Sequence, residues 1–487
     1  MFFKLKRIIC KRIIFPLFAM FFCISAFAQE ETSALAENVQ ATEQTQQAVA
    51  EAEPQKPTLK NGLTATAETL GSNILLAGFN RFVLRMDFAK ISPESIKDNL
   101  THCWVWDQDE FVVNQLGHPY QGSFYFAAGR ANNFNFYESL GYAMLGSVTW
   151  EYFAETERQS VNDLICTTFG GAMLGEAFHR LYIEASGAKS IFAFVVSPMD
   201  AVNSLITKSR PVRGTKEGVT SFEDFIRFGG VAENSRSEEK TFSDNEKING
   251  NIGGGFSVVY GNPFRNEKSI PFSYFNFDLE GGGTVKYYQV KTNIEGNLFR
   301  LGTKYTEKSS FSAMLAATFN VDWNKLSCYS ANGLGILLHS CTEFENGFSL
   351  AQKLNLSGTF FAAGDCYSLY RGHTKLPDDG VERRLYDYGT GFYGRYDFTA
   401  KQKYFGKLNL NAACLGLFDI ETAVPSYATK GATFIVDSQI SYAHIVKNNV
   451  SLGVEFSYYY KHETNYGAEN ADESIFSANL FLSRKIK

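Results

Sequence analysis

Residues 451–461 read Ser-Leu-Gly-Val-Glu-Phe-Ser-Tyr-Tyr-Tyr-Lys, and the alternation in this stretch decides the fold. Small, polar or charged side chains, such as those of Glu455 and Ser457, separate the apolar and aromatic ones. The apolar and aromatic set is Leu452, Val454, Phe456, Tyr458 and Tyr460. A period of two residues is that of a β-strand with one apolar and one polar face.

The same alternation recurs through residues 222–487, where polar or turn-rich segments separate the runs. Further apolar faces hold Tyr386, Tyr388, Phe392, Tyr396 and Phe398; Leu408, Leu410 and Ala412; Phe434, Val436, Ile440 and Tyr442; and Phe476, Ala478, Leu480 and Leu482. We predict an antiparallel β-barrel over residues 222–487 with about 12 strands, since transmembrane barrels usually have an even number. A soluble sandwich or a lipocalin-like barrel is the competing interpretation, because its strands alternate too.

A transmembrane barrel explains the aromatic content of the chain, which has 44 Phe and 25 Tyr. Lipid would contact the apolar face, and closure would pair every backbone group. The pattern assigns interfacial girdles to Tyr458–Tyr460 and to Tyr386 with Tyr388, extracellular loops to 371–384 and 461–473, and a periplasmic turn to 447–449. The C-terminus departs from the pattern of transmembrane barrels. Such barrels usually end in an aromatic residue, whereas this sequence ends Arg484-Lys485-Ile486-Lys487.

The N-terminus has the pattern of an export signal. Five basic residues precede an apolar stretch from Ile13 to Ile24, and Ala26-Phe27-Ala28 forms an A-x-A cleavage site. The apolar core is shorter than the roughly 20 residues of a transmembrane helix. We predict a signal peptide over residues 1–28, the Sec route, a Gram-negative cell and the outer membrane. Residues 29–60, rich in Glu, Gln, Ala and Thr, are expected to be a disordered linker.

Residues 61–215 are expected to form a mainly helical domain, so the fold class is α+β, with this domain preceding the barrel. The expected helices cover 120–130 after His118-Pro119, 136–156, 160–182 after a Ser160–Asp163 capping box, and a segment opening with a second box at Ser197–Asp200. Residues 80–90 fit either a strand or a helix. Charged groups interrupt each helix, so these helices are expected to pack on each other or on the barrel rather than to span lipid.

The helix expected over residues 160–182 carries a stripe of residues four apart: Asp163, Thr167, Gly171, Gly175 and His179. Two glycines at this spacing allow another backbone to approach closely. We therefore expect the helices to pack on or in the barrel through Gly171 and Gly175. Glu176 and Arg180 are spaced for an ion pair on the same helix.

The helical segment also carries a series of motifs, from Trp104-Val105-Trp106-Asp107-Gln108-Asp109 to Gly175-Glu176. The motif residues are Asp107, Asp109, Asn114, His118, Pro119, Tyr120, Gly122, Arg130, Trp150, Glu151, Asn162, Asp163, Gly170, Gly171, Gly175 and Glu176. Over about residues 85–185 this pattern resembles an uncharacterised bacterial envelope family, a domain of unknown function. The resemblance implies an exported, envelope-associated protein and supplies no reaction.

His118, Glu151 and Asp163 are weak candidates for acid–base catalysis. The sequence has no G-x-S-x-G, H-E-x-x-H or P-loop motif, and Asn114 to His118 is followed by Pro119-Tyr120 rather than Gly-Ser. His118 at the start of a helix, and a buried Glu151–Arg130 pair, are the structural alternatives. We predict no cofactor and no metal site, since no His/Cys group has zinc spacing.

Beyond residue 28 the chain has 41 basic and 51 acidic residues, because five of the 46 basic residues lie in 1–28. This balance argues against nucleic acid as a partner. The expected partners are outer-membrane lipid and the barrel-assembly machinery; a small-molecule ligand is unknown. Six cysteines follow residue 28, and Cys328 and Cys341 are expected to fall on neighbouring strands, without a pairing that the sequence can establish.

The functional expectation is an exported outer-membrane barrel of unknown biochemical role. The helical domain would plug the lumen or dock at the periplasmic mouth, which gives a structural or pore role. The alternative is an outer-membrane lipid-modifying hydrolase that uses His118 and nearby acids.

Overall fold

A computed structural model describes ten segments of the chain. They are residues 56–186, 191–209, 215, 217–237, 249–265, 270–283, 288–324, 328–366, 383–447 and 449–487. The predicted signal peptide and nearly all of the predicted linker lie outside the described residues.

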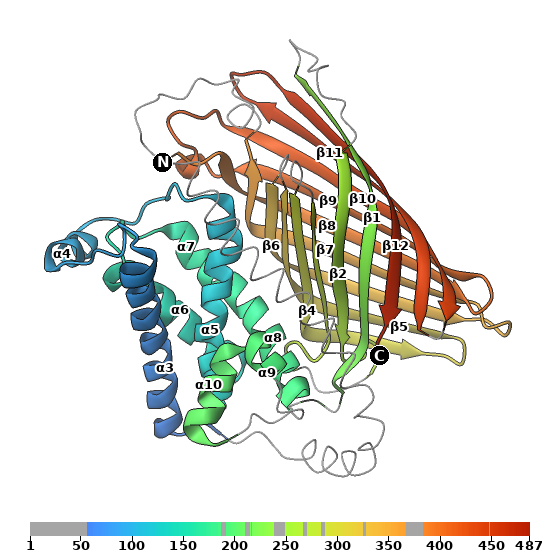
Figure 1. Ribbon diagram of the computed structural model, residues 1–487, viewed down its shortest axis with the longest axis horizontal. Coiled ribbons are helices and arrows are strands. Elements are labelled where there is room, and N and C mark those ends of the chain that lie inside the picture. The colour runs from blue at the N-terminus through green and yellow to red at the C-terminus, as the bar shows by residue number, and fades with distance from the viewer. Residues whose placement is uncertain are drawn as a thin grey trace.

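The first half of the described chain is helical, and its helices lie together on one side of the barrel (Figure 1). Its elements are α3 (Leu59–Gly78), η2 (Phe79–Leu84), α4 (Pro93–Thr101), η3 (Val113–Gly117), α5 (His118–Ala131), α6 (Phe136–Phe153), α7 (Val161–Ile165), η4 (Cys166–Gly170), α8 (Gly171–Ser186), α9 (Ile191–Val196) and α10 (Pro198–Thr207). The helices α5, α6, α8 and α10 fall where the sequence predicts them. The domain begins slightly before residue 61, because α3 starts at Leu59.

Local chemistry sets several helix ends. The Asn135 side chain caps α6 by accepting from two backbone N–H groups. The Glu138 side chain in turn accepts from the backbone N–H of Asn135. Ser160 accepts from the backbone N–H of Asp163 and opens α7, as expected. The expected capping box at Ser197 is wrong, because its hydroxyl donates to the Asp200 carboxylate instead of capping the α10 backbone.

Two helical stretches depart from simple α-helices. The helix expected over residues 160–182 is three successive segments, α7, η4 and α8, with a π-helical turn between the two α-helices. Residues 80–90, which fit either a strand or a helix, form the π-helical end of α3 up to Leu84 and irregular chain beyond it.

The second half is a closed barrel of 12 antiparallel strands, so the predicted strand number is confirmed. The strands are β1 (Val219–Ser237), β2 (Asn249–Tyr260), β3 (Phe275–Gly283), β4 (Tyr288–Tyr305), β5 (Ser309–Asn324), β6 (Cys328–Glu343), β7 (Ser349–Asp365), β8 (Tyr386–Gln402), β9 (Gly406–Asp419), β10 (Gly431–Lys447), β11 (Val450–Asn465) and β12 (Ala471–Lys485). Strands adjacent in sequence pair with each other, and β1 closes the sheet against β12, with Phe228 opposite Leu480.

The two ends of the barrel differ. At one end, called here the short-turn end, β4–β5, β6–β7, β8–β9 and β10–β11 join through two to five residues, and β1 starts beside the C-terminal Lys485. The turn predicted at 447–449 lies there. At the far end, the bounds of the loop predicted over 461–473 are too wide, because β11 continues to Asn465 and β12 starts at Ala471. Most of the loop predicted over 371–384 lies outside the described residues.

The alternation read from the sequence separates the two faces of the barrel wall. On β11, Leu452 and Phe456 are half exposed on the outside, whereas Glu455 and Tyr459 are buried and line the lumen. On β12, Leu480 is exposed and Asn479 is buried. The outer wall is therefore apolar and the lumen polar.

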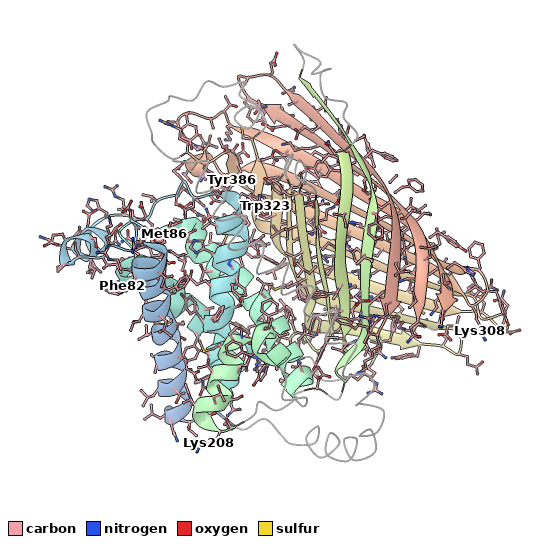
Figure 2. The ribbon with its side chains drawn as sticks, viewed as in Figure 1. Phe82, Met86, Lys208, Lys308, Trp323 and Tyr386 are labelled. Atoms are coloured by element: carbon pink, nitrogen blue, oxygen red, sulfur yellow. The ribbon has the colours of Figure 1, made fainter. Side chains whose placement is uncertain are left out.

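The helical domain makes aromatic contacts with the outer wall of the barrel. Trp106 stacks on Phe361 of β7, Phe136 stacks on Phe272 before β3, and Phe178 meets Phe277 of β3 edge to face. These rings belong to one buried cluster that both halves share. Trp323 and Tyr386 lie between the helices and the barrel in Figure 2.

Two smaller expectations also change. Tyr386 and Tyr388 are buried beneath the helical domain, so they do not belong to an interfacial girdle. Cys328 and Cys341 lie at opposite ends of one strand, β6, rather than on neighbouring strands. All six cysteines of the described residues carry free thiols. Within the described part of the chain, no helix has both the length and the apolarity needed to cross a membrane.

Candidate functional site

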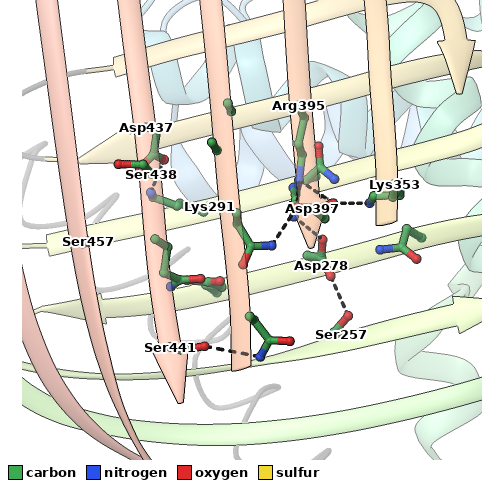
Figure 3. A pocket seen from close by; sticks show the side chains of 18 of the residues that line it. Ser257, Asp278, Lys291, Lys353, Arg395, Asp397, Asp437, Ser438, Ser441 and Ser457 are labelled. Atoms are coloured by element: carbon green, nitrogen blue, oxygen red, sulfur yellow. Dashed lines mark hydrogen bonds and ion pairs between the residues drawn. The ribbon is translucent and has the colours of Figure 1, made fainter. Parts of the chain in front are cut away.

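The lumen contains a cavity of about 570 Å³ that all twelve strands line (Figure 3). Its lining reaches from residues near the short-turn end, such as Glu223 and Lys407, to Tyr459 deeper in the barrel. The charged lining residues are Glu223, Arg227, Asp278, Glu280, Lys291, Asp322, Lys353, Arg395, Asp397, Lys407, Asp437 and Glu455. Such a lining suits a small polar solute rather than an apolar one.

Ion pairs cross the lumen between strands on opposite walls. Lys291 Nζ on β4 lies 2.6 Å from Asp437 Oδ2 on β10, six strands away around the barrel. The same ammonium lies 3.3 Å from Asp322 on the neighbouring strand. Because long side chains from opposite walls meet, the lumen is narrow at this level.

A second group of charges joins β3, β4, β7 and β8. Arg395 Nε lies 3.0 Å from Asp397 Oδ1, and its Nη2 lies 3.5 Å from Asp278 Oδ2. Lys353 Nζ lies 2.7 Å from Asp397 Oδ2 and also contacts Glu295. The charges compensate each other, as desolvated charges must.

A layer of aromatic and aliphatic side chains lies at the inner end of the cavity. Its members are Val231, Tyr329, Ala331, Tyr393, Leu415, Ile435, Tyr459 and Ile475, all of them buried. Tyr329 and Tyr459 stack with their ring centroids 6.2 Å apart. Beyond this layer, Lys461 Nζ lies 3.0 Å from Asp365 Oδ1 and within 3.6 Å of two further carboxylates. We call the eight residues the lumen layer.

The family-motif residues lie elsewhere, in the helical domain, and some of them form its junction with the outer wall. Asn114 Nδ2, which has two hydrogens to donate, lies 2.9 Å from Asp107 Oδ1 and 2.7 and 2.8 Å from the hydroxyls of Tyr386 and Tyr388. The backbone N–H of Asp107 donates to Asn162 Oδ1 at 3.1 Å. Residues far apart in the sequence therefore form one buried hydrogen-bonded junction.

Two of the three catalytic candidates, His118 and Asp163, meet in this region. His118 Nε2 lies 3.4 Å from Asp163 Oδ1, and His118 Nδ1 lies 3.2 Å from Thr167 Oγ1. All three side chains are buried. Burial lowers the pKa of His118 to about 4 and raises the pKa of Asp163 well above its ordinary value. These buried contacts among His118, Asp163 and Thr167 are the arrangement of a packed polar core.

Glu151, the third candidate, is buried beside Glu155 at the end of α6. Its Oε2 accepts from the backbone N–H of Ser160 at 2.7 Å, and burial raises the pKa of Glu151 to about 8. Glu155 accepts from Trp150 Nε1 at 3.0 Å. The expected Glu151–Arg130 pair is wrong.

Arg130 instead pairs with Glu176 on α8. Its Nε lies 2.7 Å from Glu176 Oε2, while Arg180 Nε lies 2.8 Å from Glu176 Oε1, so the predicted Glu176–Arg180 pair is confirmed. Arg180 also donates to the carbonyl of Pro271 at 2.8 Å, which ties α8 to the chain before β3. Both arginines lower the pKa of Glu176, although its burial opposes them.

Three of the four motif glycines, Gly122, Gly171 and Gly175, hold helices together rather than joining them to the barrel. A Cβ on Gly171 would lie 2.6 Å from Gly122 Cα of α5, and one on Gly175 would lie 2.8 Å from the Phe126 ring of α5. Gly170, beside Pro119 and Phe319 of β5, is the motif glycine that touches the wall. The expectation that the Gly171–Gly175 stripe packs on the barrel is therefore wrong, and the partner is α5.

Of the remaining motif residues, Tyr120 packs edge to face on Phe124, and Asp109 offers its carbonyl to the Tyr386 hydroxyl at 3.0 Å. Sequence reasoning missed Arg384, which is buried and donates to the carbonyls of Asp107 at 3.0 Å and Tyr386 at 2.7 Å. It also missed the cross-lumen pairs, whose partners no sequence spacing connects. Among the described residues, no group of His, Cys, Asp and Glu is arranged to hold a metal ion.

Residues 103–199 match a family described as domain of unknown function (DUF3943). This range contains all the motif residues, so the predicted resemblance to an uncharacterised domain family is confirmed, and the 12-strand barrel follows it. No curated protein matches the chain.

Three solved structures illustrate the similarity of fold. The toluene transporter TodX of Pseudomonas putida is 9% identical over 54% of this chain and 89% of its own, with a TM-score of 0.22. The outer membrane protease OmpT of Escherichia coli is 8% identical over 55% and 98%, with a TM-score of 0.20. The outer membrane protein Omp33 of Acinetobacter baumannii is 9% identical over 54% and 98%, with a TM-score of 0.20. At such TM-scores the similarity carries no information about function.

Proposed function

We propose that this chain is an outer-membrane channel for small polar solutes, closed in the state described. The apolar outer wall supports a membrane location, because a soluble barrel would expose polar groups there. Half-exposed apolar residues on five adjacent strands of the wall illustrate this: Phe392 and Leu410, Phe434 and Ile440, Leu452 and Phe456, Phe476 and Leu480. The strands are the membrane-spanning segments, and the short-turn end faces the periplasm.

The observation that carries the channel proposal is the cavity with barriers in series along the lumen. A solute that enters from the short-turn end meets the charged cavity first. It must then separate cross-lumen pairs such as Lys291–Asp437 and displace the lumen layer. Narrow lumens closed by side chains conduct only after those side chains move.

The helical domain docks on the wall in this proposal and does not act as a plug. Its contacts fall on outward-facing rings such as Phe361 and Phe277, which leaves the lumen to the barriers above. Insertion by the barrel-assembly machinery remains a prediction.

The test is conductance of the full chain in planar bilayers. Lys291→Ala combined with Tyr459→Ala removes one barrier of each kind and should raise single-channel conductance at least several-fold over the parent protein. Tyr458→Ala is the matched control, since Tyr458 is 46% exposed on the outer wall and Tyr459 is 5% exposed in the lumen. Heat-modifiable migration verifies that each variant is folded.

A folded double variant with unchanged conductance would contradict the channel proposal. An equal rise in the Tyr458→Ala control would also contradict it, because the effect would not come from the lumen. Lipase activity of the parent that His118→Ala abolishes would instead support the hydrolase alternative.

A further inference from the structure

In the helix α3 the buried face is polar and the exposed face is apolar. Its buried face carries Glu68, Thr69 and Asn73. Its outer face carries large apolar residues, among which Ile74, Leu75 and Phe82 of the following η2 are 73%, 76% and 79% exposed. A helix on a water-soluble domain has the opposite arrangement.

Two of the buried polar residues of α3, Glu68 and Asn73, are hydrogen-bonded inside the domain. Glu68 accepts from Asn132 at 2.8 Å and from Asn203 of α10 at 2.9 Å. The Asn73 amide donates to the Gly146 carbonyl and to Thr149 Oγ1 of α6, at 3.0 and 2.9 Å. Polar contacts therefore hold these helices together, as in helix bundles that face hydrocarbon.

The apolar outer face extends over neighbouring helices. Met144 and Phe153 of α6 and Leu205 and Ile206 of α10 are at least half exposed. With Leu59, Leu63, Leu70, Ile74, Leu75, Phe82 and Val83 of α3 and η2, they form what we call the outer helical face.

Charged side chains bound this face at both ends. Between Lys60 and Arg81 the only charged residue is Glu68, which is buried. Twenty helical residues span about 30 Å, which is the thickness of a bilayer hydrocarbon core. In Figure 2, Phe82 and Met86 lie at one end of the domain and Lys208 at the other.

The helical domain lies beside the barrel and covers part of its outer wall (Figure 1). The helices cover wall residues near the short-turn end, such as Phe222, and residues at the far end, such as Tyr386. The domain thus occupies the level at which lipid would otherwise contact the wall. Its side away from the barrel would meet the same lipid.

We propose that the outer helical face contacts the acyl chains of the membrane, so that the helical domain lies in the bilayer beside the barrel. The proposal rests on the proposed outer-membrane location. It needs no helix that crosses a membrane unaided, because Glu68, Thr69 and Asn73 of α3 are buried in the protein. It also explains why α3 exposes leucines, which water would disfavour.

The test uses cysteine labelling of the full chain in vesicles of phosphatidylethanolamine and phosphatidylglycerol, with a membrane-impermeant maleimide. The background is Cys103→Ser, since Cys103 is exposed. Ile74→Cys tests the outer helical face, Leu480→Cys the barrel wall away from the helices, and Lys97→Cys the exposed polar surface of α4. We expect Lys97→Cys to react at least tenfold faster than both others, and brominated acyl chains to quench a fluorophore at position 74.

The outcomes separate this inference from the proposed function. Protection of Leu480→Cys with rapid labelling of Ile74→Cys would overturn the inference and leave the membrane barrel intact. Rapid labelling of both would overturn both proposals. Ile74→Cys could also be protected from the maleimide without any quenching by brominated lipid. If that protection disappeared when the protein was diluted in lipid, the inference would be overturned in favour of contact between two copies of the chain.

Discussion

At the scale of single residues, Glu151 is the group whose ionisation should make stability depend on pH. Burial raises the pKa of Glu151 to about 8 from 4.5, so the folded state holds the proton more tightly than the unfolded state. The resulting stabilisation is complete below pH 4.5 and is lost as the pH rises towards 8. Buried Glu155 and Asp163 act in the same direction, since burial raises the pKa of both carboxyls.

Glu151→Gln should therefore flatten the pH dependence and raise the Tm at pH 9 more than at pH 5. Tryptophan fluorescence can follow the transition, since Trp104, Trp106 and Trp150 of the four tryptophans lie in the helical half. Glu157→Gln, on the exposed surface beyond α6, is the control and should leave the parent profile unchanged. Identical profiles for the two variants would mean that Glu151 is ionised in the folded protein.

At the scale of elements, the crossing of α5 and α8 depends on the absence of side chains at Gly122 and Gly171. Gly171→Leu should force the helices apart and destabilise the domain by roughly 1–3 kcal/mol. Protease cleavage within residues 56–209 should then increase while the barrel stays heat-modifiable, because its ladder closes on itself. Gly141→Leu on α6 is the control, since nothing lies within 4 Å of a Cβ there. Equal protection of both variants would contradict a tight crossing.

At the scale of the whole molecule, Arg384 joins the two halves. It donates to carbonyls of Asp107, Tyr386 and Ala423, and its guanidinium lies 4.3 Å from the centre of the Tyr388 ring. Arg384→Met leaves those buried carbonyls without a donor, at a cost of about 1–3 kcal/mol for each. The helical domain should detach, so that limited proteolysis releases it at protease concentrations that leave the parent intact.

The control for this prediction is Lys401→Met, an exposed position at the far end of β8, the strand that begins two residues after Arg384. Its proteolysis should match that of the parent. An Arg384→Met variant with a heat-modifiable barrel and a fully protected helical domain would show that the ring contacts suffice to hold the two halves together.

The sequence by itself determined the order of the two halves, the strand number and the two faces of the wall. Leu452–Tyr460 could be read because side-chain direction in a strand depends on the local period of two. The starts of α5 and α7 could be read because proline and capping residues act within one turn.

Only the tertiary structure decided what those faces contact. The stripe through Gly171 indicated a close helix crossing, but the sequence could not identify the partner. The partner is α5 rather than the barrel. Likewise the sequence pattern placed Tyr386 and Tyr388 in an interfacial girdle, but in the structure Asn114 of the helical domain is hydrogen-bonded to both hydroxyls. Lys291 and Asp437 meet only because closure brings β4 and β10 to opposite walls. Local patterns fix the direction of a side chain, but the contact it makes depends on chain segments brought together by folding.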